Sequence, residues 1–237
     1  MIVCIGGAHS SCGKTTLAEN LLSRLKGRWG AIKYTKTAFY TTLVSDRETI
    51  LQDGKDTARL LKAGAVDVAW IQSPIGELEE VLSMAMCNFS DVNGIIVEGN
   101  SPVQYLRSDL VVFVYGSDTA RVKEHSSKVF EKASIVVTRN VYDPKAFIGK
   151  KVCIVKTKSV QYDDSNDEDW GECLDVIMDD ISNKEIERRL CALCTDNTMS
   201  CAVARKVAVD LGVSYKLIWQ KADGLGIKIV DSELGCF

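Results

Sequence analysis

The sequence contains few of the residues and patterns that mark unusual protein classes. It has three prolines and two histidines, and its apolar runs stay well short of the roughly 20 residues that cross a membrane. The chain does not open on a basic segment followed by an apolar one, as a secretory signal would. These absences exclude collagen-like, disordered and membrane-spanning classes, and we expect a soluble protein that is not exported.

Cysteine is plentiful by comparison, with nine residues. In a chain without an export signal this is typical of a reducing compartment, where thiols stay free. The sequence therefore predicts a cytoplasmic protein. The two histidines, His9 and His125, are too few for a histidine-rich metal centre, so a bound metal would need cysteine or carboxylate ligands.

Charge is distributed unevenly along a chain whose net charge is −3. Residues 161–187 carry eleven acidic side chains and one basic side chain. We interpret residues 161–171 as a solvated acidic linker between a first domain at 1–160 and a small module at 172–237. A loop that carries ligands for a cation is the alternative interpretation of this linker.

Short β-branched runs alternate with helical patterns through the first 160 residues. The expected strands are 2–5, 31–34, 67–71, 94–97, 110–114, 134–137 and 152–155. Several are continuously apolar, as expected of strands covered on both faces. Leu17, Leu21 and Leu25 recur every fourth residue and predict a helix that covers the sheet. The pattern predicts an α/β fold with a mostly parallel sheet covered by helices.

The C-terminal module has a different pattern, which predicts a small, mainly helical domain. The expected helices are 173–181, 185–193, 201–211 and 215–225, with a short strand at 227–230. The break Gly212-Val213-Ser214 makes the last two helices resemble a helix-turn-helix. Residues 196–237 hold five basic and five acidic side chains, which argues against DNA binding and favours packing or partner binding.

Four cysteines of this module, Cys191, Cys194, Cys201 and Cys236, have the number of thiolates that a metal site needs. Cys191 and Cys194 form one close pair at an expected helix end, and the sequence has no second close pair. Buried, apolar cysteines are therefore the favoured interpretation, and the metal site stays an open alternative.

The strongest motif follows the first expected strand. We predict a phosphate-binding loop at Ala8, His9, Ser10, Ser11, Cys12, Gly13, Lys14, Thr15 and Thr16. Small residues let backbone N–H groups turn toward a phosphate, and the following helix N-terminus adds partial positive charge. We expect Lys14 to reach the β- and γ-phosphates and the Thr15 hydroxyl to bind Mg²⁺. Ala8 replaces the first glycine of the G-x-x-x-x-G-K-[ST] pattern, directly after two glycines.

An acidic residue is expected to face the magnesium from the end of another strand. Glu98 follows the apolar run 94–97, where an unpaired carboxylate would be costly to bury. We predict that Glu98 orders the metal or the attacking water, which makes Lys14 and Glu98 the expected catalytic residues. The alternative is that Glu98 caps the next helix.

Two further charged residues lie at the sheet edge where α/β proteins bind ligands. Lys33 ends the second expected strand and is predicted to contact the nucleotide. Asp56 opens a helix and is predicted to be a metal ligand alongside Thr15 and Glu98. A plain helix N-terminal role for Asp56 is an equal alternative.

The element that reads the base is expected after the strand 134–137, at Thr138-Arg139-Asn140-Val141. The usual guanine signature, [NT]-K-x-D, ends in an aspartate, and here that position is Val141. Asn140 is therefore the expected base contact. The choice between GTP and ATP stays open.

Taken together, these motifs resemble the molybdopterin-guanine dinucleotide biosynthesis protein B (MobB) group of P-loop GTPases. The matching segments are 13–17, 31–33, 54–57, 62–65 and 97–99, within about residues 1–115. The resemblance implies a Mg²⁺-dependent GTP-binding adaptor with weak hydrolysis, which assists the attachment of a nucleotide to molybdopterin. It also implies a partner among molybdenum cofactor biosynthesis proteins. A homodimer is left open, and neither nucleic acid nor membrane is an expected partner.

Two other functions fit the same residues. The first is a P-loop kinase or ATP-dependent ligase of the dethiobiotin-synthetase type, in which Lys33 and Lys36 would bind a small anionic acceptor. The second is a non-enzymatic regulator, in which the nucleotide-binding domain gates the C-terminal module.

Overall fold

The computed structural model describes residues 1–116, 126–139, 147–157 and 168–230. Two compact units divide the chain, Met1–Met178 and Asp179–Phe237. The division falls inside one helix, α6 (Gly171–Leu193). Within the described residues, every helix is too short or too polar to span a bilayer.

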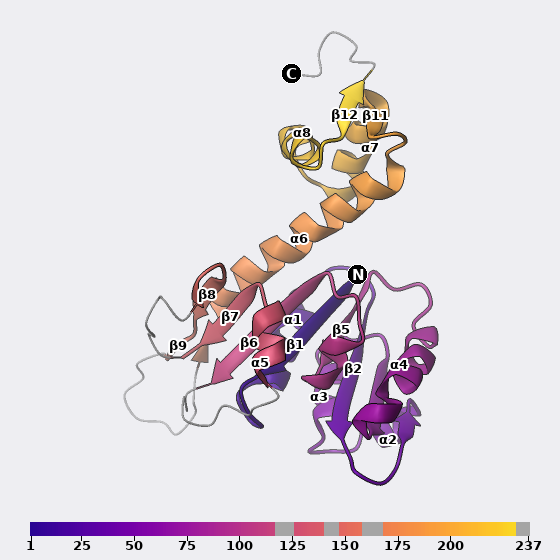
Figure 1. Ribbon diagram of the computed structural model, residues 1–237, viewed down its shortest axis with the longest axis vertical. Helices are drawn as coiled ribbons and strands as arrows, with labels where there is room; N and C mark the ends of the chain where they lie inside the picture. Colours follow the sequence, from indigo (N-terminus) through magenta and orange to yellow (C-terminus); the bar gives the residue numbers. More distant parts are fainter. Residues whose placement is uncertain (117–125, 140–146, 158–167, 231–237) are drawn as a thin grey trace. The chain divides into compact units, whose positions relative to one another are not determined.

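The first unit is built on an eight-stranded sheet (Figure 1). Its order is β3 (Thr42–Val44), β4 (Val68–Ser73), β2 (Trp29–Lys36), β5 (Gly94–Glu98), β1 (Ile2–Gly7), β6 (Leu110–Gly116), β7 (Ile135–Thr138) and β8 (Lys151–Ile154). All neighbours pair in parallel except β3, which is antiparallel to β4. The seven expected strands are all present, and the sequence reasoning missed only the half-buried edge strand β3 within this sheet. Downstream, β9 (Lys156–Thr157) and β10 (Glu168–Asp169) form a separate small ribbon.

Helices cover both faces of the sheet. They are α1 (Lys14–Arg24), α2 (Arg47–Ile50), α3 (Asp56–Lys62), α4 (Leu78–Cys87) and α5 (Ser127–Lys132), with short 3-10 helices η1 (Ile75–Glu77) and η2 (Ser101–Gln104). The apolar side of α4 and Val129 of α5 pack into one core with Cys4, Ile32 and Phe113 of the strands. Leu17 and Leu21 of α1 are fully buried outside that core, as the four-residue spacing predicts. The mostly parallel, helix-covered sheet predicted from the sequence is confirmed.

The topology of the sheet positions the site. β1 lies between β5 and β6, and β2 lies on the other side of β5. Because these strands are parallel, their carboxyl ends reach the same edge, and the residues that follow them meet there. The register pairs Lys33 of β2 with Glu98 of β5, and Ile5 of β1 also with Glu98.

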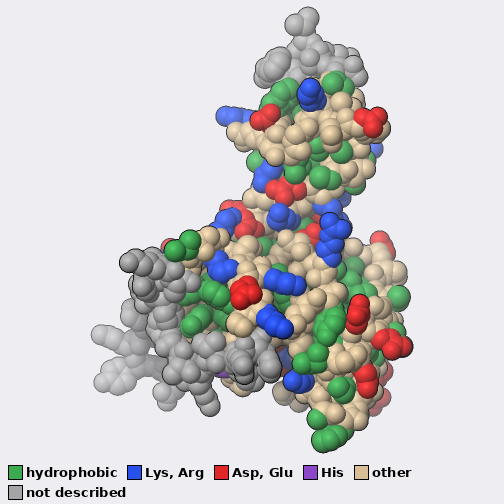
Figure 2. Space-filling model, in the orientation of Figure 1, with side chains coloured by type: hydrophobic (Ala, Val, Ile, Leu, Met, Phe, Trp, Pro, Cys, Tyr) green, Lys and Arg blue, Asp and Glu red, His purple; other side chains and the backbone are tan. Residues whose placement is uncertain are grey.

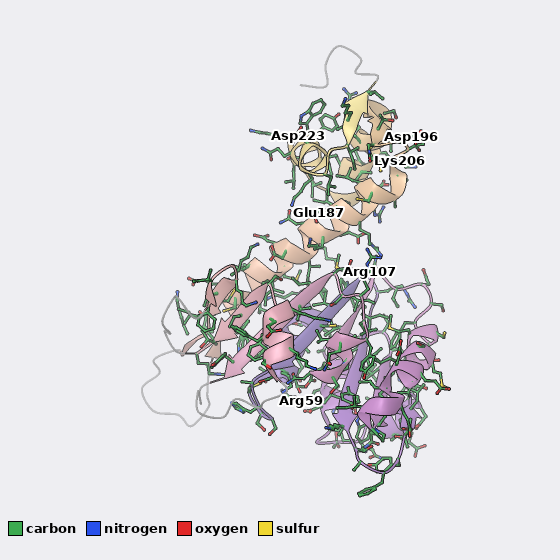
Figure 3. All side chains as sticks on the ribbon, in the orientation of Figure 1. Arg59, Arg107, Glu187, Asp196, Lys206 and Asp223 are labelled. Atoms are coloured by element: carbon green, nitrogen blue, oxygen red, sulfur yellow. The ribbon has the colours of Figure 1, made fainter. Side chains whose placement is uncertain are left out.

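The second unit packs the end of α6 against α7 (Cys201–Leu211), α8 (Tyr215–Gly224) and the two-stranded parallel sheet of β11 (Thr198–Ser200) and β12 (Lys228–Val230). Ser200 and Ser214 cap α7 and α8, and Gly212 ends α7 in the left-handed region, so the expected helix-turn-helix pattern is confirmed. Lys221 of α8 pairs at 3.1 Å with Glu187 of α6, whose position on that helix is labelled in Figure 3. Figure 2 shows basic and acidic side chains interspersed over this unit, and the absence of a nucleic-acid partner stays a prediction.

Two details of this region differ from the sequence prediction. The expected helices 173–181 and 185–193 are one continuous helix, because residues 182–184 contain neither glycine nor proline to end it. Ion pairs of Glu185 with Arg188 and Arg189 support the helix across this stretch. The acidic linker proposed at 161–171 lies mostly outside the described residues, so the proposed domain boundaries stay a prediction.

The cysteines also depart in one place from the expectation. Seven described cysteines carry free thiols. Cys201 is disulfide-bonded, so the prediction of free thiols is wrong at this residue. The prediction considered only the compartment, whereas a disulfide also depends on whether the fold brings two sulfurs close together. Cys191 and Cys194 are not joined to each other; the Cys194 thiol donates to the Cys191 carbonyl at 3.3 Å.

Cys236 lies outside the described residues. No group of three or more His, Cys, Asp or Glu side chains that could hold a metal ion occurs within the described ranges. Because the sulfur of Cys201 is already in a disulfide, it offers no thiolate to a metal, and the proposed four-thiolate site is not formed as predicted.

Candidate functional site

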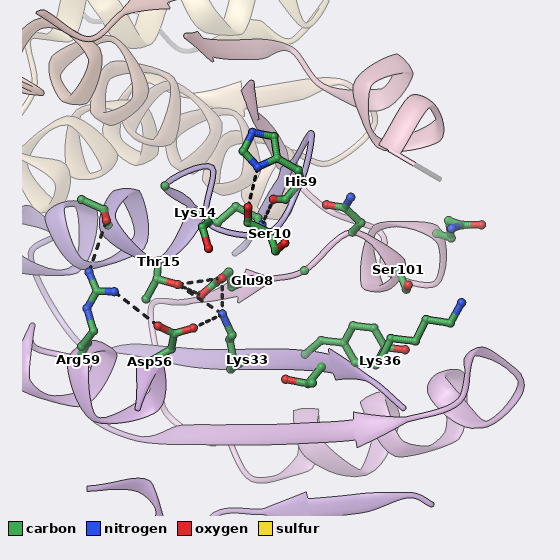
Figure 4. Close-up of a pocket in the computed structure, with 18 of the residues that line it drawn as sticks. His9, Ser10, Lys14, Thr15, Lys33, Lys36, Asp56, Arg59, Glu98 and Ser101 are labelled. Carbon is green, nitrogen blue, oxygen red and sulfur yellow. Dashed lines mark hydrogen bonds and ion pairs between the residues drawn. The ribbon is translucent and has the colours of Figure 1, made fainter. Parts of the chain in front are cut away.

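The predicted phosphate loop, residues 8–16, connects β1 to α1 at the carboxyl edge of the sheet (Figure 4). Ala8 is fully buried, and its N–H donates to the Val114 carbonyl at 3.0 Å, which ties the start of the loop to β6. Ser11 and Gly13 have φ angles of 62° and 104°, so the loop turns sharply before the helix begins. Ser10 and Ser11 are exposed, and Cys12 is buried beneath the loop.

Lys14 is the first residue of α1, and its ammonium group folds over the loop. The Nζ atom donates to the His9 carbonyl at 2.9 Å and lies 3.6 Å from the Cys12 thiol. The side chain therefore spans the concave side of the loop, where a P-loop lysine contacts phosphate oxygens. His9 also contributes its ring, whose Nδ1 lies 2.6 Å from the Ser10 carbonyl.

Glu98 forms the centre of a buried polar cluster. It is 1% exposed, and both of its carboxylate oxygens accept from the Thr15 hydroxyl at 3.0 Å. The Lys33 ammonium donates to Glu98 Oε1 at 2.5 Å and also lies 3.3 Å from Thr15 Oγ1. The alternative that Glu98 caps the next helix finds no support, because its side chain bonds to α1 and β2 instead.

Asp56 completes this cluster from the first turn of α3. Its carboxylate accepts from the Lys33 ammonium at 2.7 Å and pairs with Arg59 at 3.5 Å. Burial alone would raise the pKa of Asp56, but the hydrogen bond and charge of Lys33, with Arg59, hold it below its ordinary value. Arg59 in turn donates to Glu19 of α1, and this hydrogen bond raises the pKa of the guanidinium.

These residues also have the chemistry of a Mg²⁺ site. The Thr15 hydroxyl and the carboxylates of Glu98 and Asp56 point toward one another, with the cationic Lys33 Nζ among them (Figure 4). Hydroxyl and carboxylate oxygens are hard ligands of the kind that Mg²⁺ prefers, and in this structure the Lys33 ammonium offsets part of the charge of the two carboxylates. The three residues predicted as metal ligands are therefore brought together and fit the ion.

A cavity of about 1060 Å³ opens beside this cluster. Its walls include the phosphate loop and the Lys33–Glu98–Asp56 cluster, and it extends past Tyr34, Thr35, Lys36, Ile75, Ser101, Gln104 and Lys128. The Tyr34 side chain in this wall is fixed by a hydrogen bond, in which its hydroxyl donates to the Ser73 carbonyl at 3.0 Å. The cavity reaches well beyond the residues of the phosphate motif, and Gln104 and Lys128 carry no motif from which the sequence could have identified them.

Asn100 has a structural part in the site. Its amide donates to the Gly7 carbonyl at 2.9 Å and accepts from the Gly7 N–H at 2.8 Å. This two-way contact joins the end of β5 to the end of β1, directly before the phosphate loop.

The base-reading prediction falls on a partly described segment. Asn140, the expected base contact, lies outside the described residues. Its neighbour Arg139 does reach the phosphate loop, where its guanidinium donates to the Cys12 carbonyl at 2.9 Å. The sequence reasoning placed Arg139 in the right segment but gave it no role, because the signal for this contact lies in the fold.

Comparison with protein families decides the relationship of the chain. A model of the family described as molybdopterin guanine dinucleotide synthesis protein B (MobB) matches residues 2–126, just over half of the chain. The chain belongs to the MobB family. Membership supports nucleotide binding and a role in molybdopterin guanine dinucleotide synthesis, and the match contains every MobB motif segment identified from the sequence.

Two further comparisons add little to the family assignment. No curated protein matched the chain. Among solved structures, LpxK from Aquifex aeolicus, described as an "apo" form in complex with ATP, is similar with a TM-score of 0.41 and 16% identity. The likeness covers 65% of this chain and 53% of LpxK.

Proposed function

We propose that this MobB-family protein is a Mg²⁺-dependent GTP-binding protein with weak hydrolysis that acts as an adaptor in molybdopterin guanine dinucleotide synthesis. The observation that carries the proposal is the convergence of Lys14, Thr15, Lys33, Asp56 and Glu98 on one side of the phosphate loop. Four separate segments of the chain supply these side chains, as binding a triphosphate with its metal requires. We further propose that the protein acts in the cytoplasm.

Each residue has a role that follows from its contacts. Lys14 binds the β- and γ-phosphates, while Thr15, Glu98 and Asp56 hold the metal. When bound, Mg²⁺ would withdraw charge from the phosphate oxygens. Lys33 holds the two carboxylates together and keeps the net charge of the buried cluster low.

The proposal of weak hydrolysis is supported by the hydrogen bonds that already occupy the Glu98 carboxylate. Both of its oxygens accept hydrogen bonds from Thr15, and one also accepts from Lys33. A carboxylate held in this way orders the metal and nearby water, whereas fast hydrolysis needs a group placed to take the proton of the water.

Nucleotide titration of the full chain tests the proposal directly. With Mg²⁺ present, we expect GTP to bind about tenfold or more tightly than ATP, a difference of about 1.4 kcal/mol or more. Calorimetry with and without EDTA measures both the preference and the metal dependence, and GDP serves as the matched control for the γ-phosphate. Equal affinity for ATP would contradict the GTP assignment, and failure to bind either nucleotide would contradict the proposed function as a whole.

The kinase or ligase alternative is favoured by one specific observation. The cavity of about 1060 Å³ extends past Lys36 and Lys128, whose ammonium groups have no ion pair within the described residues. Two unpaired lysines in a cavity larger than the phosphate motif suit a second, anionic ligand. In this alternative the second ligand accepts the phosphoryl group.

A charge-removing double variant tests that alternative. We expect Lys36→Gln with Lys128→Gln to weaken inorganic phosphate binding to the nucleotide-loaded protein by about tenfold, because two charge-assisted contacts are lost. Nucleotide affinity should change by less than about threefold, since neither lysine belongs to the phosphate loop. Lys62→Gln, which removes an exposed lysine paired with Asp53, is the control. Unchanged phosphate binding in the double variant would contradict an anionic subsite.

A further inference from the structure

The contact between Arg139 and the phosphate loop lies outside the Glu98 cluster. Arg139 follows β7 directly, and its Nη1 donates to the Cys12 carbonyl at 2.9 Å. Its Nη2 lies 2.8 Å from the position that a Cβ atom on Gly13 would occupy. The guanidinium thus rests against the backbone of the loop, and a Cβ at position 13 would force it to shift.

The indole of Trp170 lies against the same guanidinium. The Arg139 Cζ is 5.6 Å from the centre of the Trp170 ring, which is a cation–π contact. Trp170 is 5% exposed, so this contact is largely shielded from water. Arg139 is therefore held on one side by the phosphate loop and on the other by an aromatic ring.

Trp170 directly precedes α6. Its carbonyl accepts from the Leu174 N–H at 2.8 Å, which closes the first turn of the helix. Cys173, Leu174 and Ile177 are each at most 1% exposed and anchor this end of α6 in the first unit. A close-packed interior has little free space, so a shift of the Trp170 indole would also displace the residues of the first turn of α6.

The loop side of the contact is where a nucleotide acts. Gly13 is the last residue before α1, and the backbone N–H groups here bind phosphate in a P-loop. Lys14, next in the chain, donates to the His9 carbonyl and would have to turn toward phosphate oxygens. The same short piece of backbone therefore faces the nucleotide with its N–H groups and Arg139 with its Cys12 carbonyl.

We propose that Arg139 is a positioning residue for the phosphate loop, and that Trp170 holds it in place, so that nucleotide binding is coupled to the first turn of α6. The inference rests on the proposed function, because it needs a nucleotide in the loop. Coupling between two sites is reciprocal. A nucleotide must therefore alter the stability of the first turn of α6, and a change at Trp170 must alter nucleotide affinity.

The test uses the full chain and two kinds of variant. Arg139→Gln removes the charge but keeps a similar size, and Trp170→Leu removes the ring. We expect each to weaken Mg·GTP binding about tenfold, within the usual range of coupling between sites. Trp170→Phe keeps an aromatic face against the guanidinium and should restore most of the affinity lost in Trp170→Leu. If Trp170 acted through packing alone, the two variants would lose similar affinity.

Hydrogen exchange of residues 170–178 supplies the second measurement. In the wild type, Mg·GTP should slow exchange in this peptide by about tenfold. In Arg139→Gln, at a nucleotide concentration that gives the same fraction of bound protein, Mg·GTP should leave the exchange rate of this peptide unchanged. Asp175→Asn is the matched control, because it removes the exposed contact of α6 with Arg24 of α1, at 3.1 Å, without touching the loop. Its nucleotide affinity and its exchange response should equal those of the wild type.

The outcomes separate the two proposals. Failure of the wild type to bind Mg·GTP or Mg·ATP would overturn the proposed function and this inference with it. Wild-type binding together with unchanged affinity and an unchanged exchange response in Arg139→Gln would overturn the inference alone. If Trp170→Leu does not fold, the affinities of Arg139→Gln and Trp170→Phe test the inference. A loss of Mg·GTP affinity in Asp175→Asn equal to that in Arg139→Gln would also overturn the inference.

Discussion

Replacing Lys14 with alanine is expected to weaken Mg·GTP binding by at least about 100-fold while leaving the melting temperature almost unchanged. Charge-assisted hydrogen bonds to two phosphate groups are worth about 3 kcal/mol together, which corresponds to that factor. The ammonium group contributes little to the fold, because its contacts are with the His9 carbonyl and, more distantly, the Cys12 thiol of the same loop. Calorimetry and thermal melting of the two proteins measure both quantities.

Lys62→Ala is the control for this experiment. Lys62, on α3, carries the same charge but is exposed and pairs with Asp53 at 3.2 Å, so its replacement should leave GTP affinity unchanged. Equal GTP affinity in Lys14→Ala and the wild type, with both proteins folded, would show that residues 8–16 are not a phosphate-binding loop.

Glu98→Gln is expected to lower the rate of GTP hydrolysis by about 100-fold or more, and GTP affinity by less than about fivefold. The amide keeps the shape of the carboxylate but loses the charge that orders the metal and its water, which matters most as charge develops in the transition state. Lys33 keeps its second partner, Asp56, at 2.7 Å, so the variant does not leave the buried ammonium without a counter-charge. Single-turnover hydrolysis and equilibrium titration separate the two effects.

Asp56→Asn provides the comparison for Glu98. The Asp56 side chain is 42% exposed, against 1% for Glu98, and it pairs with Lys33 and Arg59. Solvent screens it more strongly, so its substitution should reduce hydrolysis less than Glu98→Gln does. A parallel loss of affinity and rate in Glu98→Gln, or a loss of neither, would contradict the role assigned to that residue.

Much of the fold could be predicted because the information is local. Apolar, β-branched runs identified seven strands of the main sheet, and the leucine spacing at Leu17 and Leu21 identified the helix after the first. Gly13-Lys14-Thr15 is equally local, since the loop, the turn and the helix start are consecutive in the chain. The edge strand β3 escaped because three half-buried residues have no distinctive pattern.

The arrangement of the site was decided by the tertiary structure. The parallel pairing of β2 with β5 brings Lys33 beside Glu98, and α3 brings Asp56 to the same ammonium group, although sequence alone left the role of Asp56 evenly divided. These contacts depend on strand order and register, which no local propensity encodes.

The same distinction explains the start of α6. The sequence by itself determined where phosphate chemistry can occur, because a P-loop is specified by neighbouring residues. It did not determine that Arg139 lies between Gly13 and Trp170, since three segments far apart in the chain meet there only after the sheet and its covering helices have packed. Short-range patterns specify elements, and the burial of apolar faces against one another decides which side chains of those elements meet.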